Sequence, residues 1–334
     1  MTKKKKTTAY QFMLWSSIFG ALAMGGFWML AMPGYSHKGP LPPPTSEDTG
    51  MEGRLREHVA MLAGSIGERN TMRYSALQRA AKYISAQFAA SGYQAREQSY
   101  LADDRKVSNI WVEIKGASRP EEIVVIGAHY DSPPGSPGAD DNASGTAALL
   151  ELARLFRDVK PAMTIRFVAF VNEEPPFFRT ELMGSRVFAA EAAKKGEKVV
   201  AMLSLESIGF FSDAPGSQRY PFPLSVFYPD TGNFIGFVGN FGSHSLLHGC
   251  VRTFRETTRF PSEGVLAPEL ITGIGWSDHW SFWQEGYPAL MVTDTAPFRN
   301  PHYHQPTDTP DRLDYGRLAR IVSGLRTVVA GVSM

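Results

Sequence analysis

Residues 123–145, IVVIGAHYDSPPGSPGADDNASG, constrain the fold most, because a strand pattern and a helix pattern meet there around polar residues. The β-branched run at the start predicts a buried strand that ends near His129, and residues 143–157 carry a helix pattern. The acids between these two patterns are Asp131, Asp140 and Asp141. Ligands of open α/β sheets gather at the carboxyl ends of strands, so an imidazole and carboxylates here indicate a metal site. A capped helix beside a core histidine is the simpler alternative.

Strand and helix patterns alternate along most of the remaining chain. Strand patterns cover residues 95–101, 108–115, 122–128, 163–171, 198–206 and 287–293. Helix patterns run from Met51 to Gly92 with a break at the GERN turn, and recur at 184–195, 243–257, 277–285 and 314–331. Residues 207–230 look irregular. The alternation predicts an α/β fold with a mixed, mainly parallel central sheet and helices on both faces, in one domain over residues 51–334.

The N-terminus carries an apolar stretch. Residues 9–32 contain no charged side chain, and as a helix they would span roughly 36 Å, which is enough for a bilayer core. Residues 1–32 are therefore expected to form a cytoplasmic tip and a transmembrane signal anchor, with the basic run Lys3–Lys6 holding the N-terminus in the cytoplasm. The catalytic domain would then lie outside the cytoplasm. A signal peptide cleaved near Ala21-Leu22-Ala23 is the alternative.

Composition predicts a linker after the apolar stretch and argues against one class of partner. Residues 33–50 are rich in proline and are expected to form an extended linker between the membrane and the domain. The formal net charge is +1, and it becomes negative once Lys3–Lys6 are set aside, so nucleic-acid binding is not expected. Cys250 is the single cysteine, which excludes a disulfide within the chain. No pattern defines an oligomeric state.

Three further strand patterns end in polar residues of the same kinds. The strand at 163–171 is followed by Glu173 and Glu174, and the strand at 198–206 ends in Glu206. The last strand leads to a loop that holds His302, His304 and Asp308. Adjacent buried carboxylates repel each other unless cations or protons compensate them, and two zinc ions would supply that compensation.

The blocks GAHYDS, GADDNASG, NEE, SDHWSF and HYHQPTDTPDRLD occur in this order. Over roughly residues 55–330 the chain resembles the co-catalytic dizinc exopeptidase family, which contains secreted bacterial aminopeptidases, glutamate carboxypeptidase II and glutaminyl cyclases. The resemblance implies two Zn²⁺ per chain, a peptide substrate and hydrolysis at a chain terminus, with aminopeptidase activity favoured over carboxypeptidase or dipeptidase activity.

The resemblance also implies residue roles. Asp141 matches the carboxylate that bridges both metals, and Glu173 matches the general base that takes a proton from the water between them. The family's cis peptide falls at Asp141–Asn142. The terminal ligands of the two zinc ions match His129, Glu174, Glu206 and His304. Most members carry Asp where this chain has Glu206, which bears on the occupancy of the second metal.

Other matches concern the surroundings of the metals. Asp131 would orient the His129 ring, and Asp278, in the SDH block, would support the site. The side chains considered for a substrate pocket are Phe177, Phe178, Trp276, Phe282 and Arg299. Two alternatives remain beside the peptidase: glutaminyl cyclase-like acyl transfer on one zinc, and a non-catalytic receptor or scaffold on the same fold.

Overall fold

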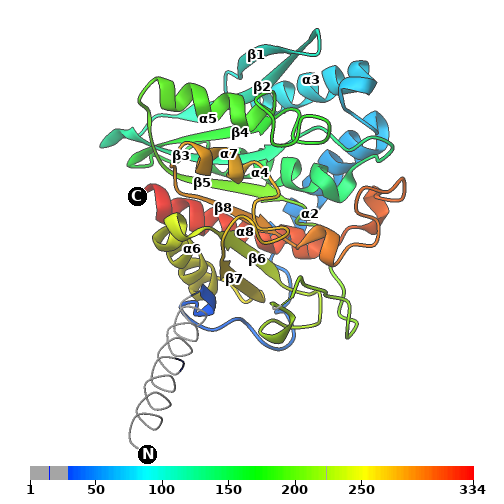
Figure 1. The fold of residues 1–334 in the computed structure, drawn as a ribbon, viewed down its shortest axis with the longest axis vertical. Helices are drawn as coiled ribbons and strands as arrows, with labels where there is room; N and C mark the ends of the chain where they lie inside the picture. Colours follow the sequence, from blue (N-terminus) through cyan, green and yellow to red (C-terminus); the bar gives the residue numbers. More distant parts are fainter. Residues whose placement is uncertain (1–14, 16–28, 223) are drawn as a thin grey trace, which may run out of the picture.

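One eight-stranded sheet runs through the part of the chain that the computed structural model describes, namely residue 15, residues 29–222 and residues 224–334 (Figure 1). The strands lie in the order β1-β2-β4-β3-β5-β8-β6-β7. The pairs β3–β4, β3–β5, β5–β8 and β6–β7 are parallel, whereas β1–β2, β2–β4 and β6–β8 are antiparallel. The predicted mixed, mainly parallel sheet is confirmed.

The elements have the following bounds. The strands are β1 (Arg96–Ala102), β2 (Arg105–Ile114), β3 (Arg119–His129), β4 (Met163–Phe170), β5 (Lys198–Glu206), β6 (Ile235–Gly239), β7 (Ser262–Leu266) and β8 (Ala289–Thr293). The helices are α2 (Ser46–Val59), α3 (Tyr74–Ala90), α4 (Gly145–Phe156), α5 (Gly184–Lys194), α6 (His244–Thr257), α7 (His279–Gln284) and α8 (Tyr315–Ser333).

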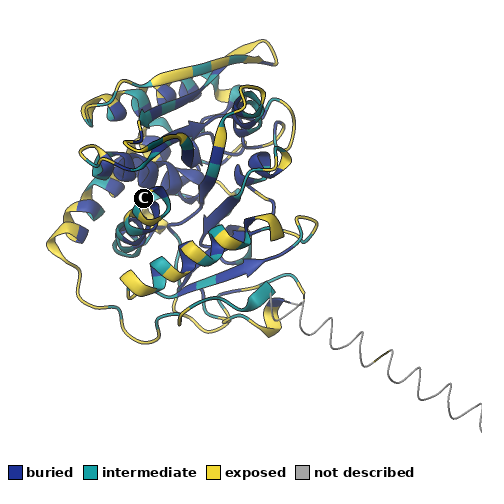
Figure 2. Cartoon of the chain, turned by 90° about the vertical axis from the view of Figure 1, so that its left-hand side faces the viewer, coloured by how far each residue is buried: buried dark blue, intermediate teal, exposed yellow. Residues whose placement is uncertain are grey.

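Helices cover both faces of the sheet, as the alternation predicts. One face packs against α3, α4, α6 and α8, and its core includes Phe167, Phe237 and Phe254. The other face packs against α5 and α7 through Phe188 and Phe282. The central strands of the sheet are buried, whereas the edge strand β1 and the outer sides of the helices are largely exposed (Figure 2). The apolar run of β3 therefore follows from its central place, where side chains of both faces leave water.

The strands β6 and β7 are absent from the sequence-based prediction. Each has only five residues, and their sequences, IGFVG and SEGVL, contain three glycines between them. Glycine contributes no side chain to strand packing, so the local pattern is weak. Pairing with β8 and with each other nevertheless makes these segments one edge of the sheet.

The predicted linker is wrong in its last residues. Helix α2 begins at Ser46, because Thr45 caps it and forms a reciprocal capping box with Asp48. The preceding residues contact the domain: Arg255 donates hydrogen bonds to the carbonyls of Pro33 and Gly34. Residues 33–36 therefore lie against α6 and β7 instead of extending away from them.

The predicted transmembrane segment, residues 9–32, falls mostly outside the described residues. Among the residues that the structure does describe, none belongs to a helix long and apolar enough to cross a membrane.

Candidate metal centre

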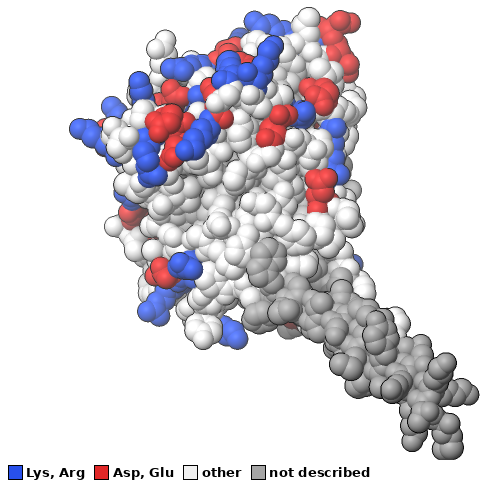
Figure 3. Space-filling view, turned by 60° about the vertical axis from the view of Figure 1, so that its left-hand side comes forward, with Lys and Arg blue, Asp and Glu red and all other residues white. Residues whose placement is uncertain are grey.

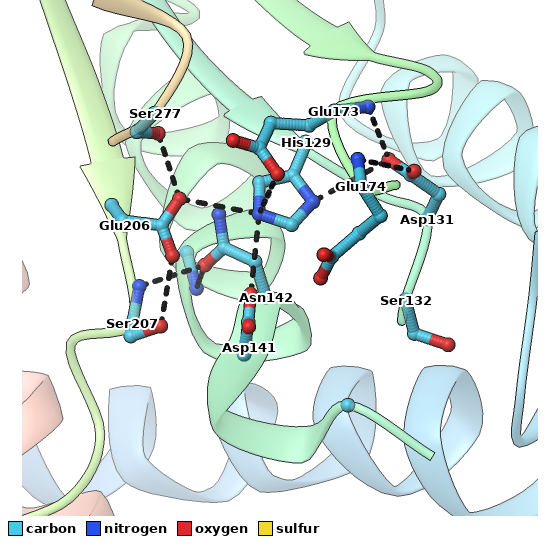
Figure 4. Close-up of polar contacts among 12 residues, drawn as sticks. His129, Asp131, Ser132, Asp141, Asn142, Glu173, Glu174, Glu206, Ser207 and Ser277 are labelled. Atoms are coloured by element: carbon cyan, nitrogen blue, oxygen red, sulfur yellow. Dashed lines mark hydrogen bonds and ion pairs between the residues drawn. The ribbon is translucent and has the colours of Figure 1, made fainter. Parts of the chain in front are cut away.

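The carboxyl ends of four neighbouring strands supply the polar residues of the centre, and Figure 4 shows those that follow β3, β4 and β5. Strand β3 ends in His129, β5 ends in Glu206, and the loop after β4 carries Glu173 and Glu174. The loop after β8 contributes His304, and Asp141 lies in the short π-helical turn before α4. The structure thus brings together all of the metal ligands and the general base that the resemblance implies.

The ligands form two sets that share Asp141. In one set the Nε2 atom of His129 lies 3.3 Å from Asp141 Oδ1 and 3.2 Å from Glu206 Oε2. In the other set the Nε2 atom of His304 lies 3.0 Å from Asp141 Oδ2 and 3.5 Å from Glu174 Oε2. One carboxylate oxygen of Asp141 therefore faces each imidazole, which is the arrangement of a bridging ligand. His302 takes no part, because its Nδ1 atom pairs with the Thr307 hydroxyl.

These donors fit zinc. The Nε2 atoms of both histidines and Glu174 Oε1 are buried without a hydrogen-bond partner among the described residues. Donor atoms of His129, Asp141 and Glu174 lie within 4.8 Å of one another. Imidazole nitrogens and carboxylate oxygens are common zinc ligands, and buried polar atoms normally have partners. The unpaired atoms therefore point into space that cations would fill.

Burial and mutual repulsion dominate the electrostatics of the centre. Burial raises the pKa values of Glu173 and Glu174 well above the ordinary glutamate value, and neighbouring carboxylates raise them further. Burial alone would lower the pKa of His129, but Glu206 and Glu173 outweigh it and raise that pKa. Burial opposes ionisation of Asp141, yet the two histidine rings beside it hold its pKa below the ordinary value. The site favours positive charge next to Asp141.

Two aspartates hold the loops that carry the ligands. Asp131 accepts hydrogen bonds from the backbone N–H groups of Glu173 and Glu174, and its Oδ1 atom lies 3.4 Å from His129 Nδ1. Asp308 accepts from the N–H groups of Asp140 and Asp141. The expected role of Asp131 thus extends beyond the ring of His129 to the backbone of the Glu-Glu pair.

The peptide bond between Asp141 and Asn142 is cis, as the resemblance implies. The Asn142 side chain donates to the Leu205 carbonyl and accepts from the N–H groups of Gly145 and Ser207. These bonds tie the loop of Asp141 to the end of β5, where Glu206 lies.

Serine hydroxyls position the Glu206 carboxylate. Ser277 donates to Oε2 over 2.7 Å and Ser207 donates to Oε1 over 2.8 Å. Ser277 belongs to the SDH block, whose next residue, Asp278, is fully buried. Burial raises the pKa of Asp278 to about 7. The block thus contacts a candidate ligand through Ser277, and support of the site by Asp278 stays a prediction.

Arg69 is a structural element of the site that the sequence analysis missed. Its guanidinium is fully buried and donates to the carbonyls of Tyr130, Gly67, Pro137 and Gly138. Burial lowers its pKa to about 10, against the pull of nearby carboxylates. Three of the four acceptors belong to the loop between His129 and Asp141, so Arg69 fixes the path between two ligands. Arg69 belongs to the GERN turn, whose sequence predicts only a loop between two helices.

An apolar pocket of about 770 Å³, its open mouth included, adjoins the centre. Glu206, Trp276 and Tyr303 contribute to its wall, and Tyr303 stacks on the His304 ring with centroids 3.9 Å apart. Burial, together with the surrounding carboxylates, raises the pKa of Tyr303 well above the ordinary value, so its phenol stays a hydrogen-bond donor. Sequence reasoning missed Tyr303.

Of the side chains considered for a substrate pocket, the structure places Trp276 on this wall and the others elsewhere. Phe282 and Phe177 are buried in the cores on opposite faces of the sheet. The Phe178 ring lies beside the Arg179 guanidinium, 5.5 Å from its centre. Arg299 is buried and donates to Gln218 and to the carbonyl of Phe234. The sequence alone does not distinguish an aromatic residue that lines a pocket from one that is buried in the core, because both follow strands in the same way.

Comparisons with known proteins agree with this geometry. The sequence profile described as Peptidase family M28 matches residues 109–329. An uncharacterized protein of Escherichia coli, YfbL, is 39% identical over 285 residues, which cover 83% of this chain and 87% of that protein. A probable aminopeptidase of Saccharomyces cerevisiae is 30% identical over 238 residues, which cover 66% of this chain and 56% of that protein.

Solved structures share the fold. A zinc aminopeptidase from Bacillus subtilis superposes with a TM-score of 0.68 at 16% identity, over 83% of this chain and 94% of that chain. A glutaminyl cyclase from Fimbriiglobus ruber superposes with a TM-score of 0.64 at 19% identity, over 90% of this chain and 99% of that chain. Fold similarity alone therefore does not separate hydrolysis from cyclisation.

The Arg69 contacts predict a specific loss. We expect Arg69→Ala to lower the free energy of unfolding by about 3 kcal/mol, because it leaves buried carbonyls without donors. We also expect zinc affinity to fall roughly 10-fold to 100-fold, because the loop between two ligands loosens. Urea denaturation and competition with a chromogenic chelator measure the two effects. Arg79→Ala, at an exposed position, is the matched control, and equal behaviour of both variants would contradict the role of Arg69.

Proposed function

The chain belongs to Peptidase family M28, and from that premise we propose that it is a zinc-dependent aminopeptidase with Glu173 as the general base. The observation that carries the proposal is the pair of ligand sets that share Asp141, with Glu173 Oε2 lying 3.8 Å from the Nε2 atom of His129. A protein that kept only the fold, as a receptor or scaffold, would need neither the complete set nor a free carboxylate next to it.

The residues of the chain define the chemistry. Bound zinc would polarise the scissile carbonyl and make a water acidic. The Glu173 carboxylate, whose backbone N–H is held by Asp131, can accept a proton from water and give it to the leaving amine. The Tyr303 phenol lies on the pocket side of His304 and can donate to negative charge that develops on the substrate oxygen.

Two zinc ions per chain are part of the proposal. His129, Glu206 and one oxygen of Asp141 would hold one ion, and His304, Glu174 and the other oxygen would hold the second. The hydroxyls of Ser207 and Ser277 fix the longer Glu206 side chain within 3.2 Å of His129 Nε2, which supports full occupancy despite the usual Asp. Complete sets for two ions favour hydrolysis over cyclisation on one zinc.

We further propose that residues 1–32 anchor the chain as a single-pass membrane protein with its catalytic domain outside the cytoplasm. The uncharged stretch at 9–32 and the basic run before it support this placement. In the view of Figure 3 charged side chains gather over the upper part of the domain and are sparse over the lower part, where Figure 1 shows α6 and β7. Residues 33–36 pack against these elements, so the sparsely charged end would lie nearest the bilayer. Peptides outside the cytoplasm would be the substrates.

Substitution of the base should separate metal binding from turnover. We expect Glu173→Gln to lower kcat for amino-acid arylamides about 10²-fold to 10⁴-fold, because the amide cannot accept the proton. Zinc content, measured by mass spectrometry of the metal, should stay at the wild-type level. Glu121→Gln changes the same charge at an exposed position and should keep full activity. Retained turnover in Glu173→Gln would remove this residue from the base role.

The number of zinc ions can be counted directly. We expect two ions per wild-type chain and one in each of the single variants Glu206→Ala and His304→Ala, because each removes a ligand of a different set. Arylamide hydrolysis should depend on both ions and should disappear on chelation. A wild-type count of one, with cyclisation of N-terminal glutamine and no amide hydrolysis, would favour the cyclase alternative.

The membrane anchor predicts the behaviour of the full chain in cells. The protein should sediment with membranes and resist extraction at alkaline pH, because a spanning helix is inserted in the hydrocarbon core. Protease added from the outer side should degrade the domain. Recovery in the soluble fraction with a new N-terminus near residue 24 would show a cleaved signal peptide instead.

A further inference from the structure

The apolar pocket beside the metal centre has a row of residues across the sheet as its floor. The strand registers place Glu206 of β5 next to Thr293 of β8, Thr293 next to Gly236 of β6, and Gly236 next to Glu263 of β7. All four residues line the pocket. Neighbouring residues of paired strands share a face of the sheet, so the row joins the metal ligand Glu206 to Glu263.

The middle of this row leaves space. Gly236 has no side chain, and Thr293 has a short one. Adjacent strands lie about 4.8 Å apart, so about 14 Å separate the Cα atoms at the two ends of the row. A peptide held at the metal centre by its N-terminal residue could direct one long side chain over Thr293 and Gly236 toward Glu263, because neither residue of the row presents a bulky side chain.

The far end of the pocket suits a cation. Glu206 and Glu263 are the two charged residues in the lining, and both are acids. The rings of Tyr220 and Tyr228 also line the pocket, with centroids 5.7 Å apart. A carboxylate beside aromatic rings attracts ammonium and guanidinium groups through charge pairing and through the faces of the rings. The apolar walls would cover the methylene stem of the same side chain.

The protein compensates the Glu263 carboxylate only in part. Arg255 Nη2 lies 3.6 Å from Glu263 Oε2, which is beyond hydrogen-bond distance, and the same atom donates to the Ser262 carbonyl over 2.7 Å. Burial raises the pKa of Glu263 even though Arg255, the Ser36 hydroxyl and Lys38 act against it. A bound cation would supply the charge that these neighbours do not.

We propose that Glu263 makes the enzyme selective for peptides whose N-terminal residue is lysine or arginine. The inference rests on the proposed aminopeptidase function, and it concerns the substrate class of that same site. Glu263 acts here as a specificity-determining residue at the end of the pocket, remote from the metals and from Glu173.

Arylamides of lysine, arginine and norleucine test the proposal with the full-length enzyme. Norleucine keeps the four-carbon stem of lysine and lacks the ammonium group, so the ratio of kcat/KM values isolates the charge. We expect the wild-type enzyme to prefer lysine over norleucine about 10-fold or more, the usual size of a hydrogen-bonded charge pair. Glu263→Gln should abolish this preference mainly through KM for lysine, whereas Glu263→Asp, which keeps the charge, should retain part of it.

Controls separate the possible outcomes. Glu256→Gln removes an exposed charge from the neighbouring helix α6 and should keep the wild-type ratio. Thermal unfolding shows whether Glu263→Gln folds, and if it does not, the wild-type ratio and Glu263→Asp carry the test. Hydrolysis of norleucine arylamide with no preference for lysine, or an unchanged ratio in Glu263→Gln, would overturn the inference alone. Failure to hydrolyse any arylamide would overturn the proposed function, and the inference with it.

Discussion

Crowding of negative charge at the carboxyl edge of the sheet is the constraint on which the structure depends. The buried acids at this edge are Asp131, Asp140, Asp141, Glu173, Glu174, Glu206, Asp278, Asp294 and Asp308. The buried arginines Arg69 and Arg299 provide far less positive charge than these acids would carry if all were ionised. Isolated buried charges cost several kcal/mol each, so the remaining compensation has to come from backbone dipoles, protons and metal ions.

Backbone N–H groups compensate the acids that support the centre and leave the ligating oxygens free. Asp131 accepts from two successive N–H groups of the Glu-Glu pair, and Asp308 does the same for the pair that ends in Asp141. Asp294 accepts from the N–H groups of Phe210 and Ala296. The donated N–H groups thus compensate part of the negative charge of each carboxylate, and the same hydrogen bonds fix the loop that contains these N–H groups. The geometry of the metal ligands follows from acids that do not bind metal themselves.

Hydrophobic runs mark strand ends clearly, so sequence patterns placed these acids and imidazoles at one edge of the sheet, whereas their roles as ligands came from the family resemblance. His129 and Glu206 end the long buried strands β3 and β5, whose apolar runs leave little doubt about their register. The strands β6 and β7 were missed because segments of five residues that contain glycine show no clear alternation of apolar and polar side chains. Their pairing, β6 with β8 and β7 with β6, is decided only in the folded sheet. Arg69 was missed for a related reason, since a buried arginine in a loop looks like a solvated one until its acceptors are known.

The strands that sequence patterns missed line the apolar pocket and carry none of the candidate metal ligands. The candidate metal centre lies at the ends of β3, β4, β5 and β8, and both an aminopeptidase and a glutaminyl cyclase structure superpose on the fold, with TM-scores of 0.68 and 0.64. Beyond β8 the sheet adds β6 and β7, which extend one face away from the metals and carry Gly236 and Glu263. Residues 33–36 pack against the outer strand, and the Ser36 hydroxyl contacts Glu263. The segment that follows residue 32 therefore contacts the wall of the pocket, and under the two proposals made above, substrate selection and membrane placement would involve the same edge of the sheet.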